Sequence, residues 1–333
     1  MATINDVAKI TGVSKATVSN VLNNKGRVSD KVREEVFAAA RDINFSMNTV
    51  ARQLVSKRSN IIGLFVPDTD YLSKSLFFAT LSSGIIEAAT SSGFSVNLIL
   101  TGKEKFFEHA VMIDGAIILN PEKKQGYYEQ LQGAGFPVVI IGRPEENESL
   151  LTYVDVENIS ISYTMTKRLL DFNHCRILLI TGPREYTISQ DQITGYQKAH
   201  AEAGVKFSDS LVFSAKYFIQ TELNGFEEVF DAQKPTAVLC PTDRSSVEVM
   251  HILLKKGLQI PKDVSVACLS GSFITEKFIP AVTGIVAPLK DIGVSAAKLL
   301  FRLIDKKLLR PVSRIFDYSI FEGTSISKNL KKI

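Results

Sequence analysis

Residues 14–20 have side-chain types and a spacing that suit contact with DNA. In a helix here, the apolar face would consist of Val18, Val21 and Leu22, and the exposed face of Lys15, Ala16, Ser19 and Asn20. The N-terminal side chains Lys15 and Ala16, with Asn20, would then meet the edges of bases. The hydroxyl groups of Thr17 and Ser19 suit phosphate oxygens.

Two more helices are predicted around this segment, and each has a start or stop signal. Thr3 and Asp6 form a capping-box-like pair at the start of the first helix, and Gly12 ends it. Ser14 would cap the second helix and Ser29 the third. Two helices joined by a glycine-containing turn within about 20 residues indicate a helix-turn-helix, whose second helix enters the major groove of DNA. A purely structural three-helix domain would have the same spacing.

The charge of the chain is distributed unevenly. Over 333 residues the formal net charge is +4, yet residues 1–60 contain 10 Lys and Arg against 5 Asp and Glu, and residues 61–333 contain 29 against 30. Clustered basic charge is typical of a surface that binds a polyanion, because neutralised phosphates release condensed counterions. A solvated basic face has the same composition, so the charge favours DNA binding without establishing it.

The composition argues against several other classes. With 45% hydrophobic and 22% charged residues, the chain is typical of globular proteins. No apolar run reaches the roughly 20 residues of a membrane span, and residues 1–10 lack the apolar core of a secretory signal. We therefore expect a cytoplasmic protein without a membrane partner. Cys175, Cys240 and Cys268 lack CxxC spacing and are expected to be buried and free, and we expect no metal and no cofactor.

From residue 60 onward, apolar strands alternate with amphipathic helices. The predicted strands are 61–66, 95–100, 115–119, 138–141, 177–181, 237–240 and 264–269. The predicted helices are 76–91, 127–134, 159–172, 190–203, 245–256 and 290–305. β-Branched runs that alternate with helices predict parallel sheets covered on both faces. Because about 270 residues exceed one ordinary domain, we expect two α/β subdomains.

The run TINDVAKITGVSKATVSNVLNNKGRVSDKVREEV, residues 3–36, resembles the DNA-binding headpiece of the lactose-repressor (LacI) family, and residues 48–54 are similar to its hinge helix. The resemblance implies a headpiece at 1–46, a hinge at 47–59 and a core at 60–333. It implies phosphate contacts from Thr3, Ser14, Thr17, Ser19, Asn23 and Arg27. It also implies minor-groove contacts from Asn48, Ala51, Arg52, Leu54 and Lys57, with Leu54 wedged into a kinked base step.

For the core, the resemblance implies a periplasmic-binding-protein-like fold of two parallel-sheet subdomains. The first would comprise residues 60–156 and 287–314, and the second residues 157–286 and 315–333. A small-molecule effector would bind between the subdomains, where such sites usually lie. The candidate contacts are Phe77, Gln192, Phe218, Thr242, Asp243 and Ser270.

This cleft departs from the pattern of the sugar-binding members. Gln192 stands where many of them have Arg, Ser270 where they have Asp, and Ala287 where Gln is frequent. The cleft would therefore bind a different ligand, such as a phosphorylated or less polar metabolite, or it would be degenerate, with control by a partner protein or by none. Neutral drift around the same sugar is the third interpretation.

The resemblance implies a homodimer that reads a palindromic operator, since a two-fold protein matches a two-fold site. The residues after Glu322 contain no heptads, so no coiled-coil tetramer is expected. The resemblance implies that the protein is a transcriptional repressor controlled by a small-molecule effector. It also implies that the protein is not an enzyme. An α/β enzyme and a binding protein without DNA function are the alternatives. The enzyme would turn over a metabolite and fail to shift DNA.

Overall fold

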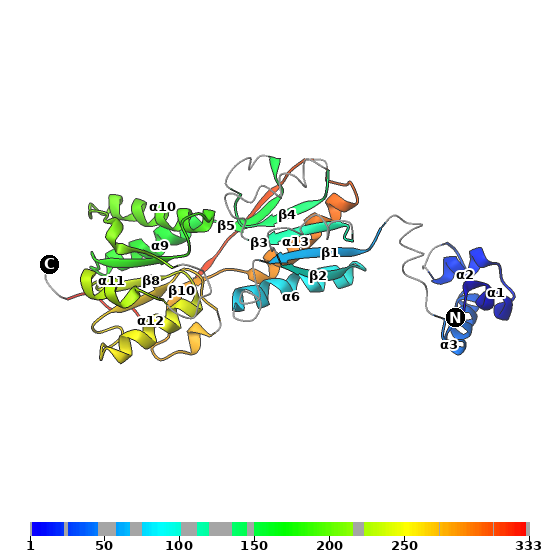
Figure 1. Cartoon of the computed structure of the whole chain (residues 1–333), viewed down its shortest axis with the longest axis horizontal. Helices are drawn as coiled ribbons and strands as arrows, with labels where there is room; N and C mark the ends of the chain where they lie inside the picture. The colour runs from blue at the N-terminus through cyan, green and yellow to red at the C-terminus, as the bar shows by residue number, and fades with distance from the viewer. Residues whose placement is uncertain are drawn as a thin grey trace. The chain divides into compact units, whose positions relative to one another are not determined.

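The computed structural model divides the chain into two compact units, Met1–Ser59 and Asn60–Ile333 (Figure 1). The residues that it describes are 2–22, 26–45, 58–66, 75–100, 112–119, 135–144, 150–215, 223–272, 274–308 and 310–330. The helix expected at 127–134 lies outside these ranges. Among the described helices, none has the length and apolar character of a membrane span.

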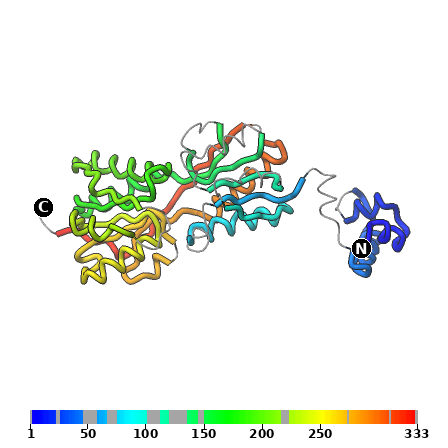
Figure 2. Tube along the Cα trace, in the orientation of Figure 1, coloured from blue at the N-terminus to red at the C-terminus, as the bar shows by residue number. Residues whose placement is uncertain are grey.

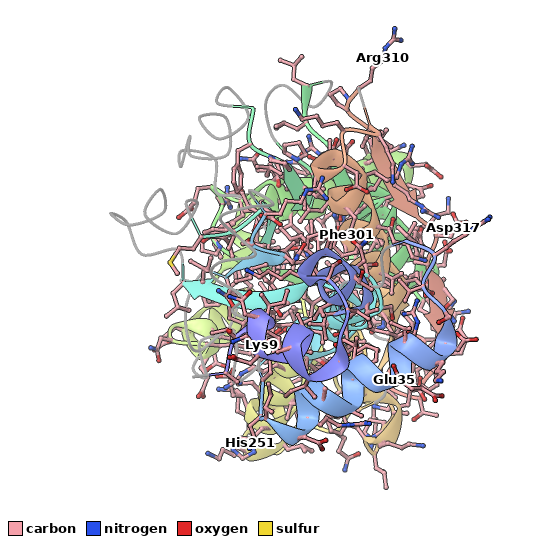
Figure 3. All side chains as sticks on the ribbon, turned by 90° about the vertical axis from the view of Figure 1, so that its right-hand side faces the viewer. Lys9, Glu35, His251, Phe301, Arg310 and Asp317 are labelled. Atoms are coloured by element: carbon pink, nitrogen blue, oxygen red, sulfur yellow. The ribbon has the colours of Figure 1, made fainter. Side chains whose placement is uncertain are left out.

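The described part of the first unit is a bundle of three helices, α1 (Ile4–Thr11), α2 (Lys15–Leu22) and α3 (Asp30–Asp42). Its core consists of Val7, Val18, Val21, Val36, Ala39 and Ala40. These positions recur at helical spacing, so each helix turns one apolar face inward and leaves the opposite face exposed. Lys9 on α1 and Glu35 on α3 project from the surface of the bundle (Figure 3).

The expected capping residues begin these helices. Asp6 accepts hydrogen bonds from both the backbone N–H and the hydroxyl of Thr3, each at 2.8 Å. The Ser14 hydroxyl accepts from the backbone of Thr17 at 3.1 Å, and Ser29 caps α3. Gly12, with φ at 69°, ends α1 in the left-handed conformation that glycine adopts without strain.

The second unit contains two six-stranded sheets. The first has the order β11-β5-β4-β3-β1-β2, and all of its pairings are parallel. Its strands are β1 (Ile61–Val66), β2 (Ser95–Leu100), β3 (Gly115–Leu119), β4 (Val138–Ile141), β5 (Tyr153–Val156) and β11 (Ser313–Phe316). Alternate residues of β1 pack against α6 (Leu76–Ser91) and α13 (Leu289–Ile304) on one face of the sheet.

The helices α6 and α13 approach each other closely through two glycines. A Cβ atom at Gly84 would overlap the backbone carbonyl of Lys290, and one at Gly293 would overlap the carbonyl of Leu81. The two backbones therefore touch directly, and both glycines are required by the lack of space.

The second sheet has the order β12-β10-β9-β8-β6-β7, in which only β12 is antiparallel to its neighbour. Its strands are β6 (Ile177–Thr181), β7 (Val212–Ser214), β8 (Ala237–Cys240), β9 (Ser265–Cys268), β10 (Thr283–Val286) and β12 (Ser319–Phe321). One face packs against α9 (Asn158–Asp171) and α10 (Thr187–Glu202), and the other against α11 (Phe226–Gln233) and α12 (Asp243–Lys255).

The chain passes between the two sheets three times, after β5, after β10 and after β11 (Figure 2). The third crossing lies at residues 317 and 318, so Ile315 and Phe316 pair with β5 in the first sheet. This differs from the boundary expected at 314/315 by two residues. Cys240 and Cys268 are buried free thiols as expected, whereas Cys175 is only half-buried because it lies in the turn before β6.

Candidate functional site

Helix α2 presents the face that the sequence predicts for contact with DNA. Val18 and Val21 are fully buried, and they fix the orientation of the helix on the bundle. Lys15, Ala16 and Asn20 are all exposed on the other side. These three side chains are therefore free of the core and face solvent, as base contacts require.

The candidate phosphate contacts differ in their local bonding. The hydroxyl groups of Ser14 and Thr17 lie 2.9 Å apart, so each restricts the rotamer of the other, and Thr3 is held by Asp6. Arg27 is exposed and Ser19 is half-buried. Outside the described residues lie Asn23 and the hinge residues Asn48, Ala51, Arg52, Leu54 and Lys57.

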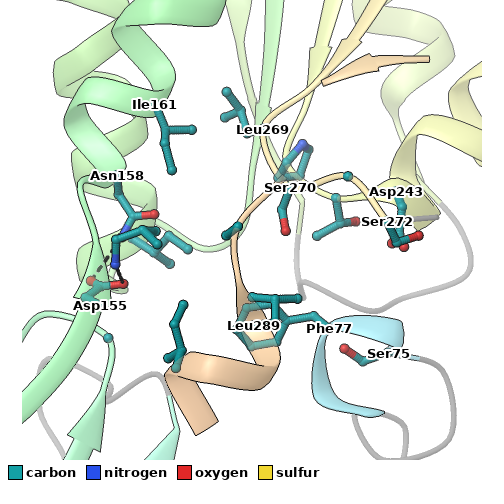
Figure 4. A pocket seen from close by; sticks show the side chains of 18 of the residues that line it. Ser75, Phe77, Asp155, Asn158, Ile161, Asp243, Leu269, Ser270, Ser272 and Leu289 are labelled. Carbon is teal, nitrogen blue, oxygen red and sulfur yellow. Dashed lines mark hydrogen bonds between the residues drawn. The ribbon is translucent and has the colours of Figure 1, made fainter. Parts of the chain in front are cut away.

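A pocket of about 110 Å³ lies between the two sheets of the second unit (Figure 4). Its walls come from the residues that follow β4, β5, β8, β9 and β10 and from the starts of α6 and α10. The carboxyl ends of parallel strands meet here, which is the usual place for ligands in open α/β sheets.

The structure brings together most of the residues that the sequence suggests for the effector. The pocket lining includes Phe77, Gln192, Thr242, Asp243 and Ser270, as well as Ala287. Phe218 lies outside the described residues. Asp155 and Asn158 were not predicted as ligand contacts, yet both line the pocket. Asp155 lies at the carboxyl end of β5 and Asn158 begins the helix that follows, and this place in the chain was the signal that could have found them.

Several polar groups of the lining are already engaged by the protein. The Thr242 hydroxyl caps α12 through Ser245, at 3.0 Å from its hydroxyl and 3.2 Å from its N–H. An Asp243 carboxylate oxygen accepts from the Arg244 N–H at 2.7 Å. The Asp155 carboxylate accepts from Val156 N–H at 2.8 Å and from the Asn158 amide at 3.0 Å. These groups hold the pocket walls in place.

The side chain of Gln192 is the exception in this lining. The residue is 3% exposed, and its Oε1 atom is buried without a hydrogen-bond partner among the described residues. Its own backbone carbonyl accepts from the Ser162 hydroxyl at 2.5 Å, which fixes α10 against α9. A buried acceptor without a partner costs about 1–3 kcal/mol, so this atom marks a place where a ligand donor would be favourable.

Asp155 is the titratable group of the pocket with a clear shift. Burial raises the pKa of its carboxyl to about 7, and the charge of Asp191 adds to this, although hydrogen bonds from Val156, Asn158 and Arg143 favour the ionised form. An acid with a raised pKa in the folded state binds more protons there than in the unfolded chain. Its contribution therefore stabilises the fold at low pH and is lost as the pH rises from about 4 to about 7.

We therefore expect Asp155→Asn to flatten the pH dependence of stability. In the parent, ionisation of the Asp155 carboxyl should lower the free energy of unfolding by about 1–3 kcal/mol as the pH rises from 5 to 8. Urea titrations at both pH values measure the difference, with the exposed Asp171→Asn as control. An unchanged pH slope in Asp155→Asn would show that the carboxyl titrates normally.

The bundle with its exposed α2 face, followed by a two-sheet core with a pocket between the sheets, defines a class of DNA-binding transcriptional regulators. Residues 3–48 match the model of bacterial regulatory proteins of the lacI family, and residues 166–326 match the periplasmic binding protein-like domain. The chain therefore combines a LacI-family helix-turn-helix domain with a periplasmic-binding-protein-like domain, and its relatives are LacI-family regulators.

Relatives that align over almost the whole chain agree with this. Catabolite control protein A of Priestia megaterium is 27% identical over 316 residues, 92% of this chain and 93% of that protein. The regulator CelR of Thermobifida fusca is 28% identical over 326 residues, 95% of each chain. The repressor PurR of Vibrio campbellii is 29% identical over 316 residues, 92% of this chain and 93% of that protein.

Solved structures show the same architecture. The complex of CelR with cellobiose superimposes with a TM-score of 0.74 at 27% identity and covers 98% of this chain and 100% of that one. The lac repressor dimer bound to operator and an anti-inducer gives a TM-score of 0.81 at 21% identity, with 98% and 99% covered. At 21% identity, the similarity to the lac repressor establishes the fold alone.

Proposed function

We propose that this protein is a repressor that binds a two-fold symmetric operator as a homodimer and responds to a small molecule in the pocket between its two sheets. The observation that carries the proposal is that one chain combines the exposed Lys15, Ala16 and Asn20 face with a pocket whose buried acceptor, Gln192 Oε1, has no partner in the described part of the chain. The first feature suits base recognition and the second suits a ligand.

Exposed apolar side chains support the homodimer. Ile86 on α6 and Leu98 and Leu100 on the edge strand β2 are each about half exposed, and so are Val247 and Leu254 on α12. Apolar groups exposed on an edge strand and on helix surfaces are typical of surfaces that a second protein covers. A dimer places two α2 helices on successive half-sites, which explains how eight-residue recognition helices achieve specificity.

The lining of the pocket favours a compact ligand with an apolar body and a hydrogen-bond donor on one edge. Apolar walls come from Phe77, Ile161, Ile188, Leu269, Leu289 and Ile292, among others. A polyol would find few partners along these apolar walls, and each hydroxyl group left without one would cost about 1–3 kcal/mol. Two carboxyl groups, Asp155 and Asp243, line the pocket against one guanidinium group, Arg244, and this balance disfavours a phosphorylated metabolite. The unpaired Gln192 acceptor argues against a degenerate pocket.

Gln192→Leu is expected to raise the stability of the ligand-free protein and to abolish its response to the effector. Leucine removes the unpaired acceptor at similar volume, so the ligand-free variant should be more stable by about 1 kcal/mol. The same change should abolish the response to the effector, because the donor of the ligand loses its partner. Urea unfolding and operator binding with and without ligand measure the two effects. A less stable variant that still responds would contradict this account.

A thermal-shift screen coupled to operator binding tests the proposed function. A ligand that binds the native state stabilises it by about RT ln(1 + [L]/Kd), and the melting temperature rises as a result. Sugars, sugar phosphates and compact cyclic alcohols or amides are the probes, with Gln192→Leu as the control protein. We expect a hit from the last group that also changes operator affinity. A hit that stabilises parent and variant equally, without an effect on DNA binding, would overturn the effector assignment.

A further inference from the structure

The segment that follows β4 is joined to the start of α10 by three hydrogen bonds. The Arg143 guanidinium donates from Nε to Asp191 Oδ2 at 3.1 Å and from Nη2 to Asp191 Oδ1 at 2.5 Å. The Thr187 hydroxyl donates to the backbone carbonyl of Arg143 at 2.8 Å. Arg143 belongs to the first subdomain, and Thr187 and Asp191 belong to the second, so all three bonds bridge the subdomains.

This ion pair differs from an ordinary surface pair. The Asp191 side chain is 6% exposed and that of Arg143 is 30% exposed. The guanidinium meets both carboxylate oxygens, which fixes distance and orientation together. Removal of either partner would leave a charge in a largely buried place, and such an uncompensated charge is strongly unfavourable. The contact therefore favours one relative position of the two groups.

The pair lies beside both the pocket and a crossing between the subdomains. Gln192 and Ile188, which line the pocket, flank Asp191 on the same helix. The backbone N–H of Arg143 also donates to Asp155, which lies in β5 directly before the first of the three crossings. A ligand that moved α10 relative to β4 would thus have to strain or break the Arg143–Asp191 pair.

We propose that Arg143 and Asp191 form a latch that holds the two subdomains in one arrangement in the absence of a ligand. The guanidinium is consequently committed to the protein and is unavailable to a ligand anion. A second consequence, which rests on the proposed function, is that the latch sets the operator affinity of the ligand-free protein. An effector then acts by shifting the balance between the latched and unlatched arrangements.

The distance between the subdomains tests the latch in the full-length protein. Spin labels at Ser83→Cys on α6 and Lys255→Cys on α12 report on the two subdomains, because both positions are exposed. Cys175→Ser removes the half-buried thiol, whereas Cys240 and Cys268 are buried. Dilution with unlabelled protein isolates distances within one chain, which are measured by double electron–electron resonance.

We expect Arg143→Met and Asp191→Asn each to shift or broaden the distance distribution, and the double variant to show no larger change than the single variants, because a broken pair cannot be broken twice. The matched control is Arg184→Met, which removes an exposed Arg–Asp pair with Asp209 inside the second subdomain and should leave the distribution unchanged. Distributions like that of the parent in folded single variants would overturn the latch, and so would additive changes in the double variant.

Operator binding separates the latch from the proposed function. The single variants should change operator affinity in the same direction by at least about fivefold, the lower end of ordinary coupling between sites. Altered distances with unaltered operator affinity would overturn the link to DNA binding. A parent protein that binds no DNA specifically would overturn the proposed function, and the distances alone would then decide on the latch.

Discussion

Replacement of both Lys15 and Asn20 by alanine is expected to weaken operator binding by about a hundredfold or more, with a much smaller effect on random DNA. Each well-placed pair between a side chain and a base contributes about 1–3 kcal/mol of discrimination. Both side chains are exposed on α2, opposite the buried Val18 and Val21, so the bundle should remain folded. Random DNA is held mainly through phosphates, which a base contact does not affect.

Affinities for operator and random DNA at fixed salt measure this difference. Lys31→Ala on α3 is the charge-matched control, since it removes one exposed positive charge outside the α2 face. A second variant, Asn20→Arg, should move the preferred base from adenine to guanine, because Arg pairs with guanine and Asn with adenine. Equal losses on operator and random DNA, or an unchanged base preference in Asn20→Arg, would show that α2 does not read bases here.

Gly293→Ala is expected to destabilise the core by about 3 kcal/mol or more. The added methyl group would overlap the backbone carbonyl of Leu81, and a backbone atom on a packed helix cannot move aside as a flexible side chain can. Overpacking usually costs about 1–3 kcal/mol, and a clash with backbone belongs at the upper end. Gly84→Ala should behave similarly, because it meets the carbonyl of Lys290 in the same contact between α6 and α13.

Urea unfolding followed by a probe of the second unit measures this effect. Ser83→Ala is the control, since it lies next to Gly84 on α6 and is exposed. Its free energy of unfolding should stay within about 0.5 kcal/mol of the parent, as for most surface substitutions. If Gly293→Ala were as stable as Ser83→Ala, the backbones of α6 and α13 would not be in direct contact.

Local signals in the sequence predicted much of this fold. Thr3, Gly12, Ser14 and Ser29 each mark a helix end, and the structure places helix boundaries at these residues. Strands buried on both faces, such as Ile61–Val66 and Ile177–Thr181, were predicted with their observed bounds, because a short apolar run that contains β-branched residues is typical of a buried strand.

Five short strands escaped prediction: β5, β7, β10, β11 and β12, each of three or four residues. Ser313–Phe316 is almost entirely exposed, and Val212–Ser214 has only three residues, so neither has a hydrophobic pattern to read. Their strand conformation depends on pairing with β5 and β6. Helix α10 begins at Thr187, three residues before the predicted start, because its first turn is held by the contact of Thr187 with Arg143.

The site was predictable in part. Resemblance to the family pointed to Gln192 and Ser270, and the structure places both in the pocket lining. The pair of Arg143 and Asp191 could not be foreseen, because 48 residues separate the partners. Their meeting depends on how two sheets and a helix are placed in space, and no spacing in the sequence encodes that placement.

Selection of binding sites from a random DNA library with the full-length protein tests the central claim most directly. We expect an inverted repeat whose half-sites lie on successive turns of the duplex, with adenine favoured at the position that Asn20 contacts. Affinity for the selected site should fall steeply with salt, as several phosphate contacts are lost. A library without an enriched sequence, or an enriched site without two-fold symmetry, would contradict a dimeric regulator that reads DNA through α2.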